Sequence, residues 1–371
     1  MRIARFSGRL PIALALALLA TAGGCRKSPH PLGTNENAPV ELVIPPTGAY
    51  TGAYIDFGDQ EDSVTLDAIE EFETMVGKQQ AIVASSSYWG EQTFPTRNLE
   101  IIWRHGSIPL VFWSPWDKPY DQNRGPDRFS LLEIIKGTWD QYIDQWADAA
   151  RAFGQPMIVS FGNEMNGDWF PWSGTFYGGA KPAEGSPGEY EGPLTFKRAY
   201  RHVVDRVRAR GAINIRWLFH TNNYAEPNDT WNYPAAYYPG SEYVDWLGLS
   251  VYGEQTPDSE WALLEPLIDW PYDQMTAVDP SKPIMVAEWG VGEFPKEGNK
   301  AEFIRAGFAM FPKYPNLKAA IYWNERWQNA DDSYSNLRVN SSVEALRAYQ
   351  RGVASPFWRE RPILRPLGEH R

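Results

Sequence analysis

Residues 157–172 read MIVSFGNEMNGDWFPW. The first five, Met157–Phe161, form an apolar run with the length and composition of a buried strand. Glu164 then follows among amides, glycines and large aromatic rings. Packing alone does not require that mixture, so the segment predicts a functional loop at the carboxyl end of a strand.

Eight strand-like segments alternate with amphipathic runs along the chain. The predicted strands are Tyr50–Phe57, Gln80–Tyr88, Ile108–Trp113, Met157–Phe161, Ile213–Phe219, Val244–Val251, Pro283–Ala287 and Leu317–Trp323. Two of the intervening runs carry apolar residues on one helical face, namely Ile143, Trp146, Ala150 and Phe153, and then Phe196, Tyr200, Val203 and Val207. This pattern predicts an α/β fold of the (β/α)8 TIM-barrel type, with working groups on the loops that follow the strands. A doubly wound open sheet is the competing architecture, but no glycine-rich phosphate turn follows the first strand.

The N-terminus has the features of an export signal. Three arginines precede an apolar run from Leu10 to Ala22, which is shorter than the ~20 residues that a spanning helix needs. The following Ala-Gly-Gly-Cys resembles a bacterial lipobox, in which Cys25 is lipidated; an ordinary secretory signal is the alternative. We therefore expect a lipoprotein signal peptide over residues 1–25, a flexible tether over 26–46 and a single barrel domain over 47–371. The protein would be an exported, membrane-anchored lipoprotein.

Composition narrows the possible partners. The formal net charge of -11 disfavours nucleic acid, because nucleic-acid binders concentrate lysine and arginine. Aromatic residues make up 14% of the chain, including 17 tryptophans, which weakly favours a carbohydrate ligand. We expect a monomer that binds a polysaccharide or oligosaccharide and contacts the membrane only through its lipid anchor.

Two glutamates end predicted strands. Glu164 follows the fourth strand, and Glu288, within PIMVAEWG, ends the seventh. Both belong at the same rim of a barrel, where a facing pair of carboxyls is what glycoside hydrolysis requires. The aromatic side chains after Glu164 would raise the pKa of an acid at this position. A strand-end glutamate can also cap a helix or pair with an arginine, but two such residues with aromatic flanks favour catalysis.

Other chemistries lack support in the sequence. The five histidines, His30, His105, His202, His220 and His370, have no metal-ligand spacing, and Cys25 is the only cysteine. We therefore expect no metal and no cofactor. The glycines at 162 and 167 precede Asp168 where a phosphate loop requires lysine, and no G-x-S-x-G elbow is present.

The segment NEMNGDWFPW from Asn163, together with AEWG at 287–290, resembles the motifs of glycoside hydrolase family 26. The resemblance covers roughly residues 50–349 and implies a retaining β-glycanase on a (β/α)8 barrel, most often a β-1,4-mannanase. It implies that Glu164 is the acid/base and Glu288 the nucleophile. It further implies that Trp169 lines the site, that Tyr252 orients the nucleophile and that Trp323 forms the aromatic floor.

Two departures from the family pattern concern the substrate. Asn163 stands before Glu164 where family mannanases place histidine, and a second family histidine is absent after the third strand, where the chain reads FWSPWD. Asparagine before the acid/base resembles the wider clan, which binds an equatorial 2-hydroxyl. Mixed-linkage β-glucan and β-xylan therefore remain beside mannan. A surface lipoprotein that binds glycan without cleaving it is the alternative function.

Three further residues are candidate sugar contacts. Trp113 ends the third strand, Trp116 lies in the loop that follows it, and His220 follows the fifth strand in FHTNNY. The tryptophans could instead be packing residues, and the asparagines beside His220 are also typical of turns. We predict that all three contribute to substrate binding.

Overall fold

The computed structural model describes residues 39–57, 63–118, 125–257, 260–329 and 332–367. The predicted signal peptide, Cys25 and the tether as far as residue 38 lie outside these ranges. Among the residues described, none of the helices has both the length and the apolar character needed to cross a membrane.

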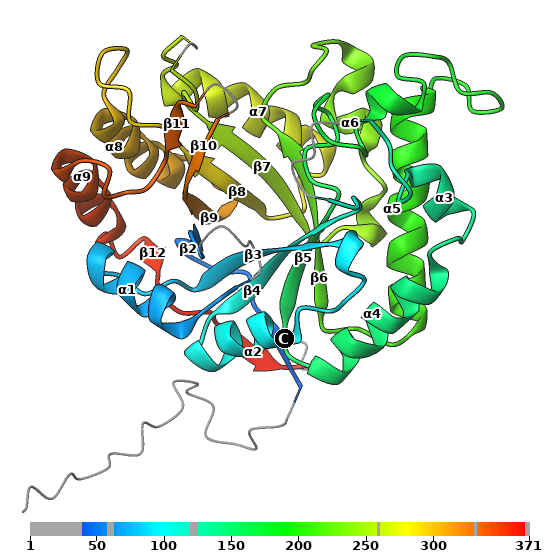
Figure 1. The fold of residues 1–371 in the computed structure, drawn as a ribbon, viewed down its shortest axis with the longest axis horizontal. Helices are drawn as coiled ribbons and strands as arrows, with labels where there is room; N and C mark the ends of the chain where they lie inside the picture. The colour runs from blue at the N-terminus through cyan, green and yellow to red at the C-terminus, as the bar shows by residue number, and fades with distance from the viewer. Residues whose placement is uncertain (1–38, 58–62, 119–124, 258–259, 330–331, 368–371) are drawn as a thin grey trace, which may run out of the picture.

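Eight parallel strands close into a barrel (Figure 1). In chain order these are β2 (Ala49–Ile55), β3 (Ile82–Tyr88), β4 (Ile108–Ser114), β5 (Met157–Phe161), β6 (Ile215–Asn222), β7 (Trp246–Tyr252), β8 (Ile284–Gly290) and β9 (Leu317–Asn324). Each pairs with the next, and β2 pairs with β9 from Tyr50 opposite Ala319 to Ile55 opposite Asn324. A two-residue strand, β12 (Trp358–Arg359), also pairs with β2. The predicted (β/α)8 barrel is confirmed, and each predicted strand overlaps one observed strand.

Helices surround the barrel on its outer side (Figure 1). They are α1 (Leu66–Val76), α2 (Thr96–His105), α3 (Leu131–Ile135), α4 (Asp140–Phe153), α5 (Glu191–Ala209), α6 (Pro234–Tyr237), α7 (Leu264–Val278), α8 (Lys300–Met310) and α9 (Val343–Val353). Single 3₁₀ turns lie at η1 (Trp89–Glu91), η2 (Gly174–Tyr177), η3 (Thr230–Asn232), η4 (Ser241–Tyr243) and η5 (Phe311–Lys313). The two predicted amphipathic faces belong to α4 and α5. Helix α4 buries Ile143, Trp146 and Ala150 and ends at Gly154, whose left-handed backbone lets its N–H bond the Ala150 carbonyl.

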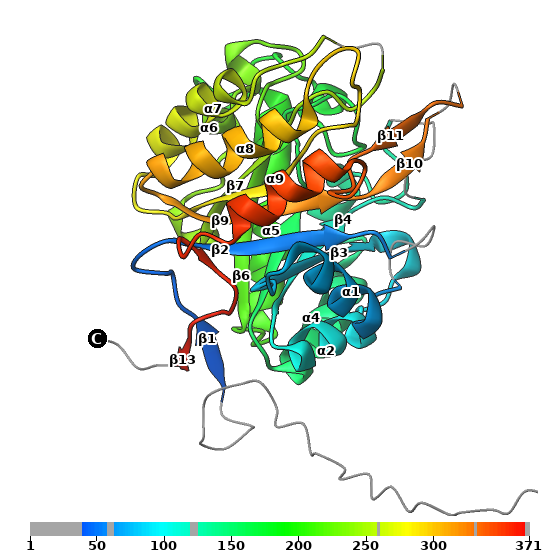
Figure 2. The same ribbon diagram turned by 90° about the vertical axis from the view of Figure 1, so that its left-hand side faces the viewer.

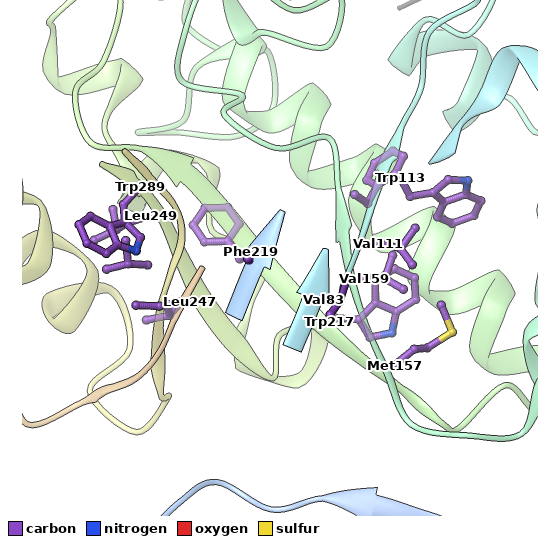
Figure 3. Close-up of a cluster of buried hydrophobic side chains, with 14 of the residues drawn as sticks. Val83, Val111, Trp113, Met157, Val159, Trp217, Phe219, Leu247, Leu249 and Trp289 are labelled. Carbon is purple, nitrogen blue, oxygen red and sulfur yellow. The ribbon is translucent and has the colours of Figure 1, made fainter. Parts of the chain in front are cut away.

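Alternate residues of each strand fill two separate apolar layers. In β4, Leu110 and Phe112 belong to the cluster inside the barrel, whereas Val111 and Trp113 belong to the cluster between barrel and helices. Figure 3 shows Trp113 and Val111 with Val159 of β5 in this outer layer. The period of two that strands impose therefore decides which side chains can reach the mouth of the barrel.

A small two-stranded sheet covers the amino ends of the strands. Strand β1 (Val40–Leu42) pairs antiparallel with β13 (Leu364–Pro366), and Leu42 joins the cluster inside the barrel. Glu41 binds the guanidinium groups of Arg216 and Arg365. The expected tether over 26–46 overlaps this sheet, because Val40–Leu42 form a strand, and its residues before 39 lie outside the described ranges. The sequence gives no signal for a three-residue strand whose partner lies at the far end of the chain.

The opposite end of the barrel carries a short hairpin. Strands β10 (Arg326–Gln328) and β11 (Tyr334–Asn336) pair antiparallel beyond β9. Figure 2 shows this hairpin on the side of the carboxyl ends of the strands, away from β1 and β13. The barrel thus has one covered end and one end that is open for a site.

Candidate active site

A cleft of about 1320 Å³ lies at the carboxyl ends of the strands. Every barrel strand, or the loop that follows it, contributes to its lining. Examples are Asp56, Ser86, Ser114, Asn163, Asn222, Tyr252, Glu288 and Trp323. This is the rim at which (β/α)8-barrel enzymes place their catalytic groups.

The structure brings the two predicted glutamates together at this rim. Glu164 lies three residues beyond β5, and Glu288 lies within β8. Each is only 7% exposed, and both line the cleft. One carboxylate oxygen of Glu164 lies within 4.8 Å of one of Glu288. Two carboxyls that are far apart in the sequence therefore face the same small volume.

A β-bulge turns Glu288 toward the cleft. Leu249 pairs with Val286 but Ser250 pairs with Glu288, so Ala287 is an extra residue in β8. Ala287 belongs to the cluster inside the barrel and Trp289 to the outer cluster. Strict alternation would point Glu288 outward, toward the helices. The bulge lets two consecutive residues face the barrel axis, as bulges beside active sites often do.

Glu164 occupies a strained backbone conformation. Its φ is 55°, in the left-handed region that non-glycine residues rarely adopt. Its N–H donates to the His220 carbonyl at 2.8 Å, which ties the loop after β5 to β6. Such strain is characteristic of functional positions. In this conformation Glu164 lines the cleft.

Trp169 holds the carboxyl of Glu164 from one side. Its indole Nε1 donates to Oε2 of Glu164 at 2.8 Å, and the ring lines the cleft. The ring lies directly over Gly167, where a Cβ atom would come within 2.5 Å of it. Gly167 is thus needed for the indole to fold back toward the acid.

Tyr252 and Trp323, which the family resemblance assigns to the site, both line the cleft. The Tyr252 hydroxyl donates to Oε2 of Glu288 at 2.8 Å. Burial and the nearby charge of Glu288 raise the Tyr252 pKa well above its usual value, so the hydroxyl keeps its proton. Trp323 lines the cleft and stacks on Tyr54, with ring centroids 3.9 Å apart.

The electrostatics of the pair favour a shared proton. Burial raises the pKa of both carboxyls, and the charge of Glu164 raises that of Glu288 further. Hydrogen bonds oppose burial: those from Ser250 and Trp169 lower the Glu164 pKa, and that from Tyr252 lowers the Glu288 pKa. Two buried carboxylates this close repel each other as anions, so the pair holds one proton over a wide pH range.

His220 does not contact the cleft, which corrects the predicted sugar contact. It is 1% exposed and lies inside the barrel. Its Nδ1 bonds the Ser160 hydroxyl at 3.2 Å, and its Nε2 bonds the Ser250 hydroxyl at 2.8 Å. Burial lowers its pKa to about 3, so the ring is neutral. Although a ring nitrogen lies within 4.8 Å of both glutamates, both nitrogens are engaged by serines. His220 therefore supports Ser250, which in turn bonds Glu164.

Trp113 is a core residue, which corrects the second predicted contact. It is fully buried, stacks on Trp146 of α4 with centroids 4.0 Å apart, and donates from Nε1 to the Tyr142 hydroxyl at 3.0 Å. Because β4 alternates, Phe112 and Ser114 face the cleft while Trp113 faces the helices. Trp116, two residues beyond the strand, does line the cleft. Asn163 also lines it, beside Glu164.

Several residues of the site were not predicted from the sequence. Glu254 is 4% exposed, lines the cleft, and leaves its Oε1 without a hydrogen-bond partner among the described residues. The β10–β11 hairpin adds Trp327 and Tyr334, and the Arg326 guanidinium lies 3.6 Å above the Tyr334 ring. Ser250 could have been found from strand alternation, since it lies two residues before Tyr252 on the same face. The hairpin could not, because its strands are only three residues long.

The parallel barrel and the facing pair of buried glutamates define a (β/α)8-barrel glycoside hydrolase site. Comparison with known proteins gives the family. The sequence profile of Glycosyl hydrolase family 26 matches residues 132–343, more than half of the chain. The chain belongs to this family.

Characterised relatives share only part of their length with this chain. Endoglucanase H of Acetivibrio thermocellus is 28% identical over 293 residues, which are 78% of this chain and 29% of that protein. A mannan endo-1,4-beta-mannosidase of Bacillus subtilis is 30% identical over 181 residues, which are 47% of this chain and 42% of that protein. The chain thus spans less than half the length of either relative.

Solved structures agree on the fold. The catalytic domain of a Bacillus endo-beta-1,4-mannanase superposes with a TM-score of 0.60 at 18% identity, covering 84% of this chain and 87% of that one. A Cellulomonas fimi endo-beta-1,4-mannanase gives 0.60 at 16% identity, covering 84% and 72%. At these identities the likeness establishes the barrel architecture.

Proposed function

We propose that this protein is a retaining endo-β-glycanase in which Glu288 is the nucleophile and Glu164 the acid/base. The observation that carries the proposal is the proximity of the two carboxyls in the cleft, where one oxygen of each lies within 4.8 Å of the other. Retaining enzymes hold these groups about 5–5.5 Å apart, whereas inverting enzymes need roughly 6.5–9.5 Å to admit a water. The separation favours double displacement.

The hydrogen bond to Glu288 supports its role in the first half of the reaction. The Tyr252 hydroxyl stabilises Glu288 as an anion. Burial raises the pKa of Glu164. Two carboxyls this close do not both ionise readily, so we assign the proton to Glu164 when Glu288 is the anion. Glu288 attacks the anomeric carbon while the bond to the leaving oxygen breaks, and Glu164 gives its proton to that oxygen. A glycosyl ester on Glu288 results.

The second half uses the other donors. Once Glu288 is esterified its charge is gone, so the Glu164 pKa falls. Hydrogen bonds from Trp169 and Ser250 stabilise the Glu164 anion at this stage. Glu164 then takes a proton from water, and the oxygen of that water displaces Glu288 from the same face that the leaving group occupied. The net stereochemistry is retention.

The charges of the cleft favour a neutral glycan. Six acids and two arginines lie among its described lining residues: Asp56, Glu164, Glu254, Glu260, Glu288, Glu325, Arg326 and Arg338. An anionic polysaccharide would be repelled by this surface. Asn163 beside the acid/base resembles the wider clan's contact with an equatorial 2-hydroxyl, and a relative that aligns with 78% of this chain is named an endoglucanase. We therefore place a β-glucan containing 1,4 linkages first. Mannan is second, since another relative is named a mannosidase.

A polysaccharide panel tests the function. Purified protein is incubated with mixed-linkage β-glucan, glucomannan, mannan, xylan and laminarin, and new reducing ends are measured, with Glu288→Gln as control. We expect fastest release from mixed-linkage glucan and none from the variant. Tight binding without products from any of the five would instead establish the non-catalytic, glycan-binding alternative.

We also propose that Cys25 carries a lipid anchor. The described chain begins beside β1, at the covered end of the barrel. Each buried methylene of an acyl chain contributes ~0.8 kcal/mol to membrane binding. Both the wild type and Cys25→Ser are expressed with the signal peptide in a bacterial host, and the extracts are then separated into detergent and aqueous phases. The wild type should partition into the detergent phase and Cys25→Ser should not. Equal partitioning of the two proteins would contradict the anchor.

A further inference from the structure

A second hollow of about 390 Å³ adjoins the catalytic cleft. Asn223 and Tyr224, which follow β6, line both cavities. Its other lining residues come from the loop before α6 and from α7, and they are Asn228, Tyr233, Pro266, Leu267, Trp270 and Pro271. Helices α6 and α7 lie side by side at this edge of the barrel (Figure 1). The hollow is therefore a continuation of the cleft along the outer rim.

Large rings are exposed here where packing does not require them. Trp270 is 44% exposed and Tyr224 is 53% exposed. Tyr233 meets Trp270 edge to face, with ring centroids 5.3 Å apart, which fixes the orientation of the indole. Helix α7 turns Ile268, Tyr272 and Met275 inward, so Trp270 lies on the face that the core leaves free. Single exposed apolar residues are ordinary, but three rings around one hollow are a built surface.

The rings continue a line that starts at the acid/base. Trp169 bonds Glu164, and the Tyr224 ring lies 6.0 Å from the Trp169 ring. Beyond Tyr224 the hollow opens toward Trp270. The Asn223 amide donates to the Leu267 carbonyl at 3.1 Å, which fixes the junction between the two cavities. A chain that leaves the cleavage site past Trp169 meets Tyr224 and then Trp270.

The chemistry of the hollow fits a neutral sugar chain. None of its described lining residues is charged, and they combine aromatic faces, prolines and asparagine amides. Aromatic faces cover the apolar face of a pyranose ring, and amides bond its hydroxyls. We propose that Trp270, Tyr233 and Tyr224 form a distal glycan-binding platform, which holds the same β-glycan chain that the catalytic cleft cleaves. This inference rests on the proposed function.

Substitution of Trp270 tests the platform by comparing long and short substrates. One substrate is the polysaccharide that the wild type hydrolyses fastest among the five above, and the other is a 4-nitrophenyl β-disaccharide of the same sugar. Loss of one aromatic contact of about 1–1.4 kcal/mol corresponds to a five- to tenfold change. In Trp270→Ala, the ratio of kcat/KM on polysaccharide to kcat/KM on disaccharide should fall about five- to tenfold, through a higher KM for the polysaccharide. Trp270→Phe should give a smaller fall in the ratio.

Phe176→Ala is the matched control, because Phe176 is 37% exposed and lines neither cavity. Its ratio should equal that of the wild type. A ratio for Trp270→Ala within twofold of the Phe176→Ala ratio, with disaccharide hydrolysis intact, would overturn the platform and leave the proposed function standing. Failure of the wild type on all five glycans would refute the proposed function and the platform's occupant with it.

Discussion

Replacing Tyr252 with phenylalanine removes one hydroxyl and leaves the ring. That hydroxyl donates to Glu288 at 2.8 Å, and it is the hydrogen bond that lowers the Glu288 pKa against burial and the charge of Glu164. In the variant the shared proton moves toward Glu288, so the productive form with ionised Glu288 and protonated Glu164 becomes less populated. A hydrogen bond to a charged group contributes about 1.5–3 kcal/mol, which corresponds to about 10- to 150-fold.

The assay is kcat/KM on a 4-nitrophenyl β-glycoside and on polysaccharide from about pH 4 to about pH 8. We expect Tyr252→Phe to lose about 10- to 150-fold and to shift the acidic limb of the profile to higher pH, because the Glu288 pKa rises. Tyr314→Phe is the control, since that hydroxyl also bonds a carboxylate, Asp269, but lies before β9 at the other end of the barrel. A Tyr252→Phe enzyme within twofold of wild type, with an unmoved acidic limb, would refute the reasoning.

Three other substitutions test separate parts of the site. Glu288→Ala should be inactive without azide and should form the α-glycosyl azide when azide is added. Glu164→Ala should lose about 10²- to 10⁴-fold on polysaccharide and, with azide, should form the β-glycosyl azide from an aryl glycoside. Products of the opposite configurations would exchange the two roles. In the unfolded chain His220 has a pKa of about 6.5, whereas in the folded chain burial lowers it to about 3. Below about pH 6.5 the unfolded chain therefore binds a proton that the folded chain does not, and the free energy of unfolding falls as the pH is lowered. Urea unfolding from about pH 4 to 6 should show a steeper acid loss for wild type than for His220→Gln, by up to about 1.4 kcal/mol per pH unit, and parallel slopes would contradict a neutral buried imidazole. Trp113→Ala should lose about 3–5 kcal/mol of stability in the same assay with KM unchanged, whereas a raised KM in a stably folded variant would restore its place in the cleft.

The barrel was predictable because its signals are local. Each strand is a short apolar run, and α4 and α5 show clear amphipathic faces, so the order of elements follows from the chain alone. Glu164 and Glu288 were predictable as a pair because both follow apolar runs, and parallel strands bring such positions to one rim. Trp169, Tyr252 and Trp323 came from the family resemblance, and all three line the cleft.

Two wrong contacts had a signal that a closer reading could have used. In β4 the alternation of Leu110 and Phe112 with Val111 and Trp113 already separates the inner layer from the outer one. His220 lies on the inward face of β6, two residues below the rim residue Asn222. Alternation along each strand therefore predicts that Trp113 faces the helices and that His220 lies inside the barrel, below the cleft.

Other features depend on contacts that no local pattern encodes. By alternation alone Glu288 would face the helices, and only the bulge at Ala287 reverses it. The pairing of β1 with β13 joins residues from opposite ends of the chain, so the boundary of the tether could not be located. The left-handed backbone of Glu164 depends on the loop packing against β6.

The claim that Glu288 forms a covalent intermediate is tested most directly by mass spectrometry of the Glu164→Ala enzyme. An aryl β-glycoside with a good leaving group does not need the missing proton, so the first step proceeds while the second stalls for lack of a base. We predict that the intact protein gains the mass of one glycosyl unit and that proteolysis places it on the peptide containing Glu288. Release of the aryl group with no adduct and with inverted sugar configuration, or an adduct on any other residue, would contradict the mechanism.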